Sequence, residues 1–241
     1  MDNGSRTAPA VVLAIGIALG GWLAGQGLVQ ARRSDRFVTV KGVAERVVTA
    51  DTGLWPLRFV AADDDLARAQ ARIEGQRRAV MRFLARHGLD STSTELQGLE
   101  VTDVRANPYF NGPAANRYVI TLSLMVRSED PGTLQSASQR VSELVDAGVV
   151  LTASGPGGGP TYLFTKLNDF KPQMIAEATG SARQAAERFA TDSRSRLGGI
   201  RRANQGIFEI LPRDQAPGIM EGQQVQKTLR VVTTVEYQLE G

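Results

Sequence analysis

The sequence predicts an α+β fold, in which antiparallel strand hairpins pack against long helices after one N-terminal transmembrane helix. Segments with strand-like alternation of apolar and polar residues occur in pairs, and long segments with helical spacing lie between the pairs. An uncharged apolar run lies near the N-terminus. The predicted order is ββαββ-αββαββ, which differs from the strict strand–helix alternation of a parallel nucleotide-binding sheet.

The segment 37–128 contains four predicted strands and one helix. Its clearest strand covers 117–127, where Tyr118, Ile120, Leu122, Leu124 and Val126 alternate and should share one face. In the strand 52–62, Trp55, Leu57 and Phe59 alternate in the same way. The helix covers 66–87 and ends before Gly88. The two other strands cover 37–48 and 95–104.

The segment 131–241 begins with a helix over 131–147, opened by a proline. Its apolar residues, expected to be buried, are Leu134, Val141, Leu144 and Val145. Short strands are predicted over 149–153 and 161–167. A second helix, 172–196, presents Met174, Ala178, Ala182, Ala185 and Phe189 at helical spacing. Strands over 206–211 and 227–239 complete the chain, and the last one alternates cleanly.

The predicted domain organisation has three parts. Residues 1–10 form an N-terminal tail, 11–31 a transmembrane anchor or signal segment, and 37–241 one α+β domain with halves 37–128 and 131–241. A chain of 241 residues is long enough to bury a substantial core.

The apolar run is 19 residues long, from Val11 to Val29, and contains no charge. At about 1.5 Å per residue it measures roughly 28 Å, enough to cross a bilayer core. A signal peptide has a shorter apolar region, of about 7–15 residues. The sequence therefore favours an uncleaved anchor, with cleavage near Ala31 as the alternative.

Four glycines in this run have the small-xxx-small spacing that allows membrane helices to approach closely. Gly16 and Gly20 form one pair, and Gly21 and Gly25 form the other. We expect them to pack membrane helices together. The alternative is that glycine is simply common in such segments.

Composition argues against several kinds of site. The chain has no cysteine and one histidine, so no thiol chemistry, zinc site or Ser-His-Asp triad is expected. The net charge is +3, with 24 of the 28 basic residues arginine, which is far from the basic patch of a nucleic-acid-binding protein. We therefore predict no catalytic, cofactor-binding or metal-binding residues, no cofactor and no nucleic-acid partner.

Two polar features have structural explanations. His87 lies at the predicted end of a helix, where an imidazolium favours the negative end of the helix dipole. The triplet Asp63-Asp64-Asp65 lies where the same helix begins, and acidic residues there cap backbone amides. No Ca²⁺-loop spacing follows the triplet.

Gly42 interrupts an otherwise regular strand, FVTVKGVAERVVTAD, at residues 37–51. A glycine within a strand often marks a β-bulge, which changes the face that the following side chains occupy. We predict such a bulge, with Lys41, Glu45 and Arg46 on the solvated face and Val43 and Val47 as apolar positions.

A predicted hairpin tip, NPYFNGP at 107–113, carries two neighbouring aromatic residues. Exposed aromatic side chains are typical anchors of protein interfaces. Tyr109 and Phe110 are therefore the expected contact with a partner. The alternative is that they fold back onto their own domain.

Four stretches resemble the SIMPL domain family, once known as a domain of unknown function. They read FVTVKGVAERVVTADTGLWPLRF, FTKLNDFKPQMIAEATGSARQAAERFA, LGGIRRANQGIFEI and LRVVTTVEYQLE, and the resemblance covers nearly all of 37–239. It implies a bacterial envelope protein, with relatives that assemble into rings or channels or are linked to oxidative-stress tolerance. The eukaryotic namesake is a signalling adaptor. The family brings no agreed catalytic residues.

These observations predict a non-enzymatic protein of the bacterial inner membrane that acts as a homo-oligomer, with its large domain in the periplasm. The arginines at 32, 33 and 36 instead place that domain in the cytoplasm by the positive-inside rule, but large domains translocate despite such charges. The alternatives are an enzyme with a cleft between two halves and a signalling adaptor that faces the cytoplasm.

Overall fold

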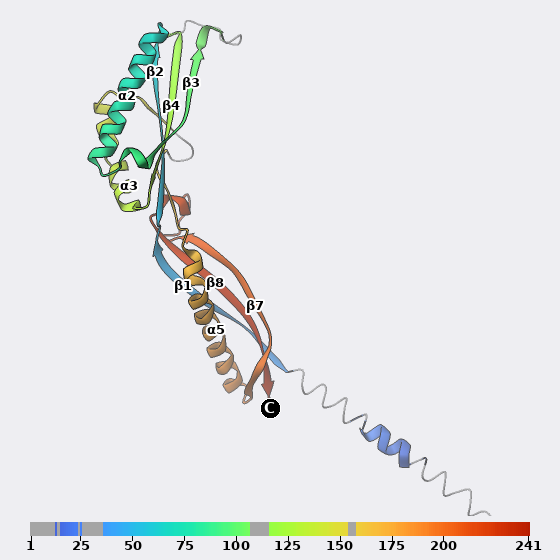
Figure 1. The fold of residues 1–241 in the computed structure, drawn as a ribbon. Helices are drawn as coiled ribbons and strands as arrows, with labels where there is room; N and C mark the ends of the chain where they lie inside the picture. Colours follow the sequence, from blue (N-terminus) through green and yellow to red (C-terminus); the bar gives the residue numbers. More distant parts are fainter. Residues whose placement is uncertain (1–12, 14, 24, 26–35, 107–115, 154–157) are drawn as a thin grey trace, which may run out of the picture. The chain divides into compact units, whose positions relative to one another are not determined.

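The computed structural model describes residues 13, 15–23, 25, 36–106, 116–153 and 158–241. They form a mixed α+β fold with antiparallel sheets and several helices (Figure 1). Two compact units divide the chain. The α2 unit contains residues 46–170 and 209–229, and the α5 unit contains residues up to 45, 171–208 and 230–241. Both units are discontinuous in the chain, whereas the halves considered from the sequence were continuous.

The α2 unit is built on a sheet with strand order β3-β4-β2-β5. Strand β2 (Thr52–Asp63) pairs antiparallel with β4 (Tyr118–Ser128) along its whole length, so that Leu57 lies opposite Leu124. Strand β3 (Thr94–Asp103) pairs with the other side of β4. Helix α2 (Leu66–Arg86) covers one face of this sheet. These elements confirm the predicted order ββαββ.

The core of the α2 unit lies between this sheet and its helix. Alternate residues of β2 and β4 face it, and so does one side of α2. The best-covered members are Phe59, Ile73, Val80, Phe83, Leu84, Ile120 and Val126, all fully buried. The faces predicted for both strands are confirmed. Burial of each such side chain contributes about 1.5–3 kcal/mol to the stability of the fold. This explains why the alternation alone predicted these strands.

The next segment of the α2 unit departs from the prediction. A single helix was expected over 131–147, but the chain forms α3 (Pro131–Ser138) and α4 (Ser142–Asp146). The Ser138 hydroxyl donates to the Gln135 carbonyl, a side-chain bond that competes with helical hydrogen bonding. Leu134 and Leu144 are buried as expected, whereas Val145 is 60% exposed.

Two short strands follow, both of which pair with β2. They are β5 (Leu151–Thr152) and β6 (Thr161–Leu163), and each is shorter than predicted. The expected strand 161–167 ends early because α5 already begins at Leu167. Asp51 accepts hydrogen bonds from the amides of Thr165 and Lys166, which satisfies donors just before this helix.

The α5 unit is built on a three-stranded sheet with strand order β1-β8-β7. The strands are β1 (Phe37–Thr49), β7 (Arg196–Pro212) and β8 (Gln226–Glu240), and helix α5 (Leu167–Asp192) accompanies them. The alternation predicted for β8 is confirmed, because Leu229, Val231, Val235 and Tyr237 are buried. Strand β7 is much longer than the predicted segment 206–211.

Helix α5 contacts its sheet through a stripe of small residues. Ala178, Ala182, Ala186 and Ala190 are buried at strict four-residue spacing, together with Met174. Phe189 was expected on this face but is 57% exposed. Small side chains let a helix and a sheet approach closely.

Gly42 lies in a regular stretch of β1 with no change of face. Inward and outward positions alternate through it, so Ala44 and Val48 are buried while Val43 and Val47 are exposed. The predicted bulge and the assignment of Val43 and Val47 are therefore wrong. A Cβ added to Gly42 would lie 1.9 Å from the Ala178 carbonyl oxygen, so the glycine is needed for close approach of α5.

The two units repeat one topology. In the α2 unit the chain order β2-α2-β3-β4 gives the sheet order β3-β4-β2, and in the α5 unit β1-α5-β7-β8 gives β7-β8-β1. Each unit is thus a β-α-β-β motif whose third element, β3 or β7, is the end strand of its sheet. This internal symmetry is not evident as a sequence repeat.

At the N-terminus, residues 13, 15–23 and 25 are helical. Within the described part of the chain, no helix has both the length and the apolar character needed to cross a membrane. The membrane segment over 11–29 remains a prediction.

Candidate functional site

The residues singled out from the sequence as contacts fall into two groups. Tyr109 and Phe110 lie outside the described residues. Gly16, Gly20, Gly21 and Gly25 lie in the N-terminal helix, and a Cβ added to any of them would meet no atom within 4 Å. Their role in packing membrane helices remains a prediction.

The acidic triplet is used inside the fold. The Asp65 carboxylate accepts the Arg68 amide as the N-cap of α2, which confirms the capping role. Asp63 is 7% exposed at its side chain and pairs with Arg68 and Arg72, both at 2.9 Å. Asp64 accepts the backbone amide of Arg117 at 3.0 Å. Each carboxylate therefore already has a protein partner.

Asp63 should make stability depend on pH. The Asp65 amide and the Arg68 side chain hold the pKa of Asp63 below its usual value. A lowered pKa stabilises the fold above about pH 4, the unfolded value, and this contribution is lost as pH falls through the folded pKa. We expect Asp63→Asn to lower the melting temperature at pH 7 and the deficit to shrink below about pH 4. A constant deficit between pH 7 and pH 3 would contradict this assignment.

His87 also has a structural position. It is the C-cap of α2, and its ring centroid lies 4.6 Å from that of Phe83. Its Nε2 lies 3.3 Å from a carboxylate oxygen of Glu143 in α4. Groups of three or more side chains suited to metal binding do not occur among the described residues. His87 thus links two helices.

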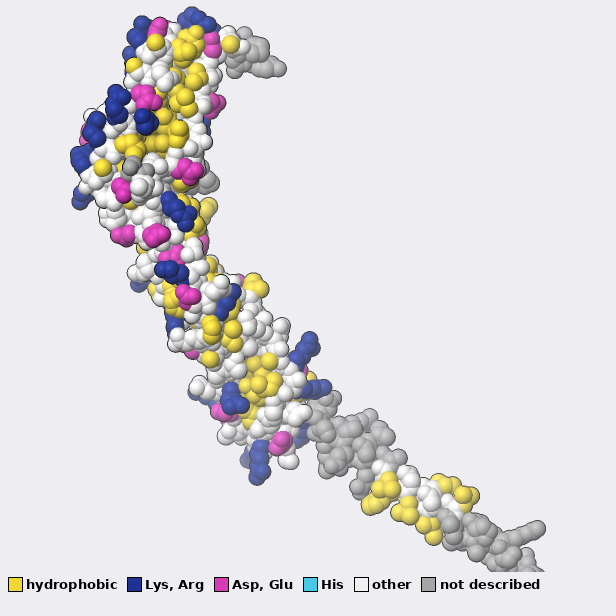
Figure 2. Space-filling view, in the orientation of Figure 1, with side chains coloured by type: hydrophobic (Ala, Val, Ile, Leu, Met, Phe, Trp, Pro, Cys, Tyr) yellow, Lys and Arg dark blue, Asp and Glu magenta, His cyan; other side chains and the backbone are white. Residues whose placement is uncertain are grey.

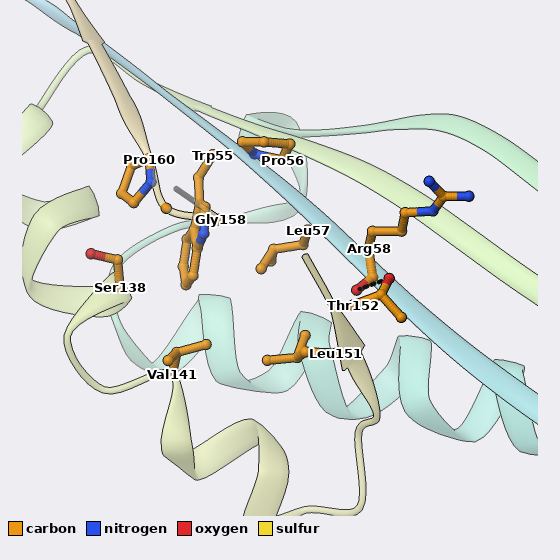
Figure 3. Close-up of a pocket in the computed structure, with 11 residues that line it drawn as sticks. Trp55, Pro56, Leu57, Arg58, Ser138, Val141, Leu151, Thr152, Gly158 and Pro160 are labelled. Atoms are coloured by element: carbon orange, nitrogen blue, oxygen red, sulfur yellow. Dashed lines mark hydrogen bonds between the residues drawn. The ribbon is translucent and has the colours of Figure 1, made fainter. Parts of the chain in front are cut away.

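A cavity of about 250 Å³ lies beside β2, between Trp55, Pro160 and Val141 (Figure 3). Its other lining residues include Ser138 and Thr152, whose hydroxyls donate to the carbonyls of Gln135 and Arg58. The Arg58 side chain extends away from the cavity in Figure 3. No carboxylate or imidazole is among the described side chains that line it. The cavity therefore lacks a general base for Ser138.

A second hollow, of about 550 Å³, lies where the far end of β2 has β4 on one side and, among the described residues, no strand on the other. Side chains from α2 occupy this edge. The Gln76 amide nitrogen donates to the Val60 carbonyl at 3.2 Å, and Arg72 donates to the Ala62 carbonyl at 3.0 Å. Side chains that satisfy edge carbonyls in this way discourage pairing with another chain.

Strand β3 is a different kind of edge. It is the end strand of its sheet, and none of its ten residues is buried. Leu96, Leu99 and Val101 are about half exposed, at 60%, 48% and 48%. In the described part of the chain no strand pairs with its outer side. The α2 unit therefore presents a strand whose outer side is unpaired and whose apolar side chains are exposed.

The register explains why these three residues lie on one face. A bulge between Leu96 and Gly98 inserts one residue, so Leu96 and Leu99 lie opposite Leu124 and Leu122 of β4. They consequently share the apolar face that α2 covers, but at a margin that the helix does not reach. Figure 2 shows hydrophobic side chains along this margin, beside the basic side of α2.

Strand β7 is the corresponding edge of the α5 unit. It is the end strand of the three-stranded sheet, and residues 199–207 are all exposed. Ile200 is 51% and Ile207 80% exposed. Edge strands with exposed apolar side chains are sites of pairing with a further strand. The chain thus presents two such edges, β3 and β7.

Sequence reasoning missed both edges as a site. It predicted a strand over 95–104 and only the segment 206–211 of β7, because a strand exposed on both faces lacks the apolar alternation that marks a half-buried strand. The missing alternation was itself informative, because a strand without a buried face lies at the edge of its sheet.

A comparison with known families, proteins and structures gives one assignment. The family model described as "SIMPL: Protein of unknown function (DUF541)" matches residues 38–237. No curated protein matches the chain significantly. Among solved structures, the regulatory subunit of aspartate kinase from Thermus flavus shares 13% identity over 82% of this chain and 89% of that one. Its TM-score of 0.19 is too low to support any argument.

Proposed function

Because the chain belongs to the SIMPL family of proteins of unknown function, we propose that it is a non-enzymatic protein of the bacterial envelope that acts by assembling with copies of itself. The observation that carries this proposal is the pair of edge strands, β3 and β7, whose outer sides have no partner strand in the described part of the chain and on which apolar side chains are exposed. A soluble monomer usually blunts such edges, as α2 does for β2 through Gln76 and Arg72.

The proposed location is the inner membrane, with the folded domain in the periplasm. The apolar run over 11–29 is long enough for an anchor. An anchor also favours assembly, because it confines the copies to one plane and raises their effective concentration. Stress tolerance is the proposed physiological role, in line with the resemblance described above.

Two measurements test the proposal: the oligomeric mass of the chain tests assembly, and labelling of one variant tests location. The chain has no cysteine, so Ser181→Cys, at an exposed position of α5 away from both edge strands, provides one thiol. We expect the full chain, purified in mild detergent, to have a discrete oligomeric mass by light scattering. We also expect a membrane-impermeant maleimide to label the variant in cells whose outer membrane alone is permeabilised.

The mass measurement and the labelling measurement each test one part of the proposal. A monomeric mass for the unsubstituted chain across micromolar concentrations would overturn the proposal of self-assembly. Labelling that occurs only after the inner membrane is broken would overturn the envelope location and favour the cytoplasmic adaptor. A wild-type chain without cysteine, labelled in parallel, gives the background.

A further inference from the structure

The two edge strands differ in charge. Strand β3 carries Glu95, Glu100 and Asp103 and no basic residue, so its formal charge is −3. Strand β7 carries Arg196, Arg201, Arg202 and Glu209, three positive charges and one negative, so its formal charge is +2. The two edges are therefore electrostatically complementary.

The charges on each edge are separated along its strand. Glu95 and Glu100 are five positions apart, and so are Arg196 and Arg201. When β3 and β7 lie side by side, parallel or antiparallel, an alignment brings one of these glutamates opposite one of these arginines. Opposite charges across neighbouring strands contribute roughly 0.2–1 kcal/mol for each pair.

The bulge in β3 places its two glutamates on one face. Glu95 lies opposite Met125 and Glu100 opposite Thr121, and these β4 residues are four positions apart. Without the bulge, a spacing of five would send the two side chains to opposite faces. Glu100 lies 3.5 Å from Arg58, an exposed pair that contributes little and exchanges readily.

Both edges also carry apolar residues between these charges. In both strands the two charges flank a leucine and a second branched apolar residue: Leu96 and Leu99 in β3, Leu197 and Ile200 in β7. Pairing would cover the exposed parts of Leu96, Leu99 and Ile200. Apolar contact supplies the association energy, and the charges select the partner.

We propose that β3 of one copy pairs with β7 of a second copy, with the acidic edge of β3 against the basic edge of β7. The inference rests on the proposed self-assembly and specifies its interface. Each copy has one edge of each kind, so the contact is heterologous, and repetition of it generates a closed ring or an open filament.

Other edge pairings are less favourable. Two copies of β3 would place three negative charges against three, and two copies of β7 would bring like charges together as well. The remaining end strand of that sheet, β1, carries Lys41, Glu45 and Arg46, a mixture of signs.

Charge reversal of each edge tests the pairing. In the full chain, Glu95→Arg with Glu100→Arg makes both edges basic, and Arg196→Glu with Arg201→Glu makes both edges acidic. We expect each double variant alone to assemble at least about tenfold more weakly than the wild type, measured by light scattering. An equimolar mixture should regain assembly, because each interface in the mixture joins an acidic edge to a basic one.

A matched control separates this effect from net charge. Arg78→Glu with Arg82→Glu makes the same change of charge as Arg196→Glu with Arg201→Glu, at exposed positions of α2, and should assemble like the wild type. Circular dichroism of all variants checks the fold. The four-residue variant, with both edges reversed, should assemble without a partner.

The outcomes distinguish the two proposals. A wild-type chain that remains monomeric overturns the proposed self-assembly, and the edge pairing with it. A wild-type oligomer that tolerates either reversal overturns the edge pairing alone. Loss of assembly in each double variant without recovery in the mixture also overturns it, because the two edges then do not contact one another.

Discussion

Gly42→Ala should destabilise the α5 unit by about 3 kcal/mol, at the upper end of the cost of overpacking. The added Cβ would lie 1.9 Å from the Ala178 carbonyl oxygen and 2.5 Å from the Ala182 amide nitrogen. Both are backbone atoms of α5, so no rotamer change relieves the clash and the helix itself must move. Thermal or urea denaturation, followed by circular dichroism, measures the loss.

Gly180→Ala is the matched control for this prediction. Gly180 lies within α5 at an exposed position, and a Cβ there would meet no atom within 4 Å. An alanine in a helix interior is more favourable than a glycine by about 0.5–1 kcal/mol, so this variant should be slightly more stable than the wild type. Equal stability of the two alanine variants would show that β1 and α5 are not in close contact at Gly42.

Gly42 also illustrates how far the sequence constrains the fold. A glycine inside a strand is compatible with a bulge or with close approach of another backbone, and both explanations satisfy the local sequence. The choice depends on Ala178 and Ala182, more than 130 residues later in the chain. Local periodicity cannot report such a contact.

The predicted elements follow the same distinction. Strands β4 and β8 have one buried face each, and their alternation gave their faces correctly. The start of α5 was misplaced by five residues because the Asp51 carboxylate that satisfies the preceding amides is 114 residues away from Thr165. The sequence supports elements that are locally amphipathic and misses boundaries that distant side chains determine.

The candidate site depended on topology in the same way. Glu95, Glu100, Arg196 and Arg201 are ordinary surface charges in the sequence. They become a candidate interface only when β3 and β7 are recognised as the end strands of their sheets. The aromatic contact predicted at Tyr109 and Phe110 remains a prediction, because both residues lie outside the described part of the chain.

Lys227 is a buried charge at a position of β8 where the alternation of the strand predicts an apolar side chain. It precedes Leu229 and Val231 on the inward-facing positions of β8, and its side chain is fully buried. Its ammonium group donates to the Glu221 carbonyl oxygen at 2.8 Å and pairs with the Glu221 carboxylate. Glu221 begins the short 3-10 helix η3 (Glu221–Gln223), so one residue supplies both partners.

Removal of the two members of this pair should have unequal effects. Glu221→Ala leaves a buried ammonium group without its carboxylate, which should cost about 3 kcal/mol, the lower end for a broken buried pair, since Glu221 is itself one-third exposed. Lys227→Met removes the buried charge and keeps a flexible apolar side chain of similar length. The remaining Glu221 carboxylate can turn to water, so this variant should lie within about 1 kcal/mol of the wild type.

The double variant Glu221→Ala with Lys227→Met completes a thermodynamic cycle and isolates the coupling between the two side chains. If the cost of Glu221→Ala arises from the orphaned ammonium group, it should nearly vanish in the Lys227→Met background. Urea denaturation of the four proteins measures this difference. An equal cost in both backgrounds would show that Glu221 stabilises η3 by itself, and that the carboxylate contributes nothing to the burial of Lys227.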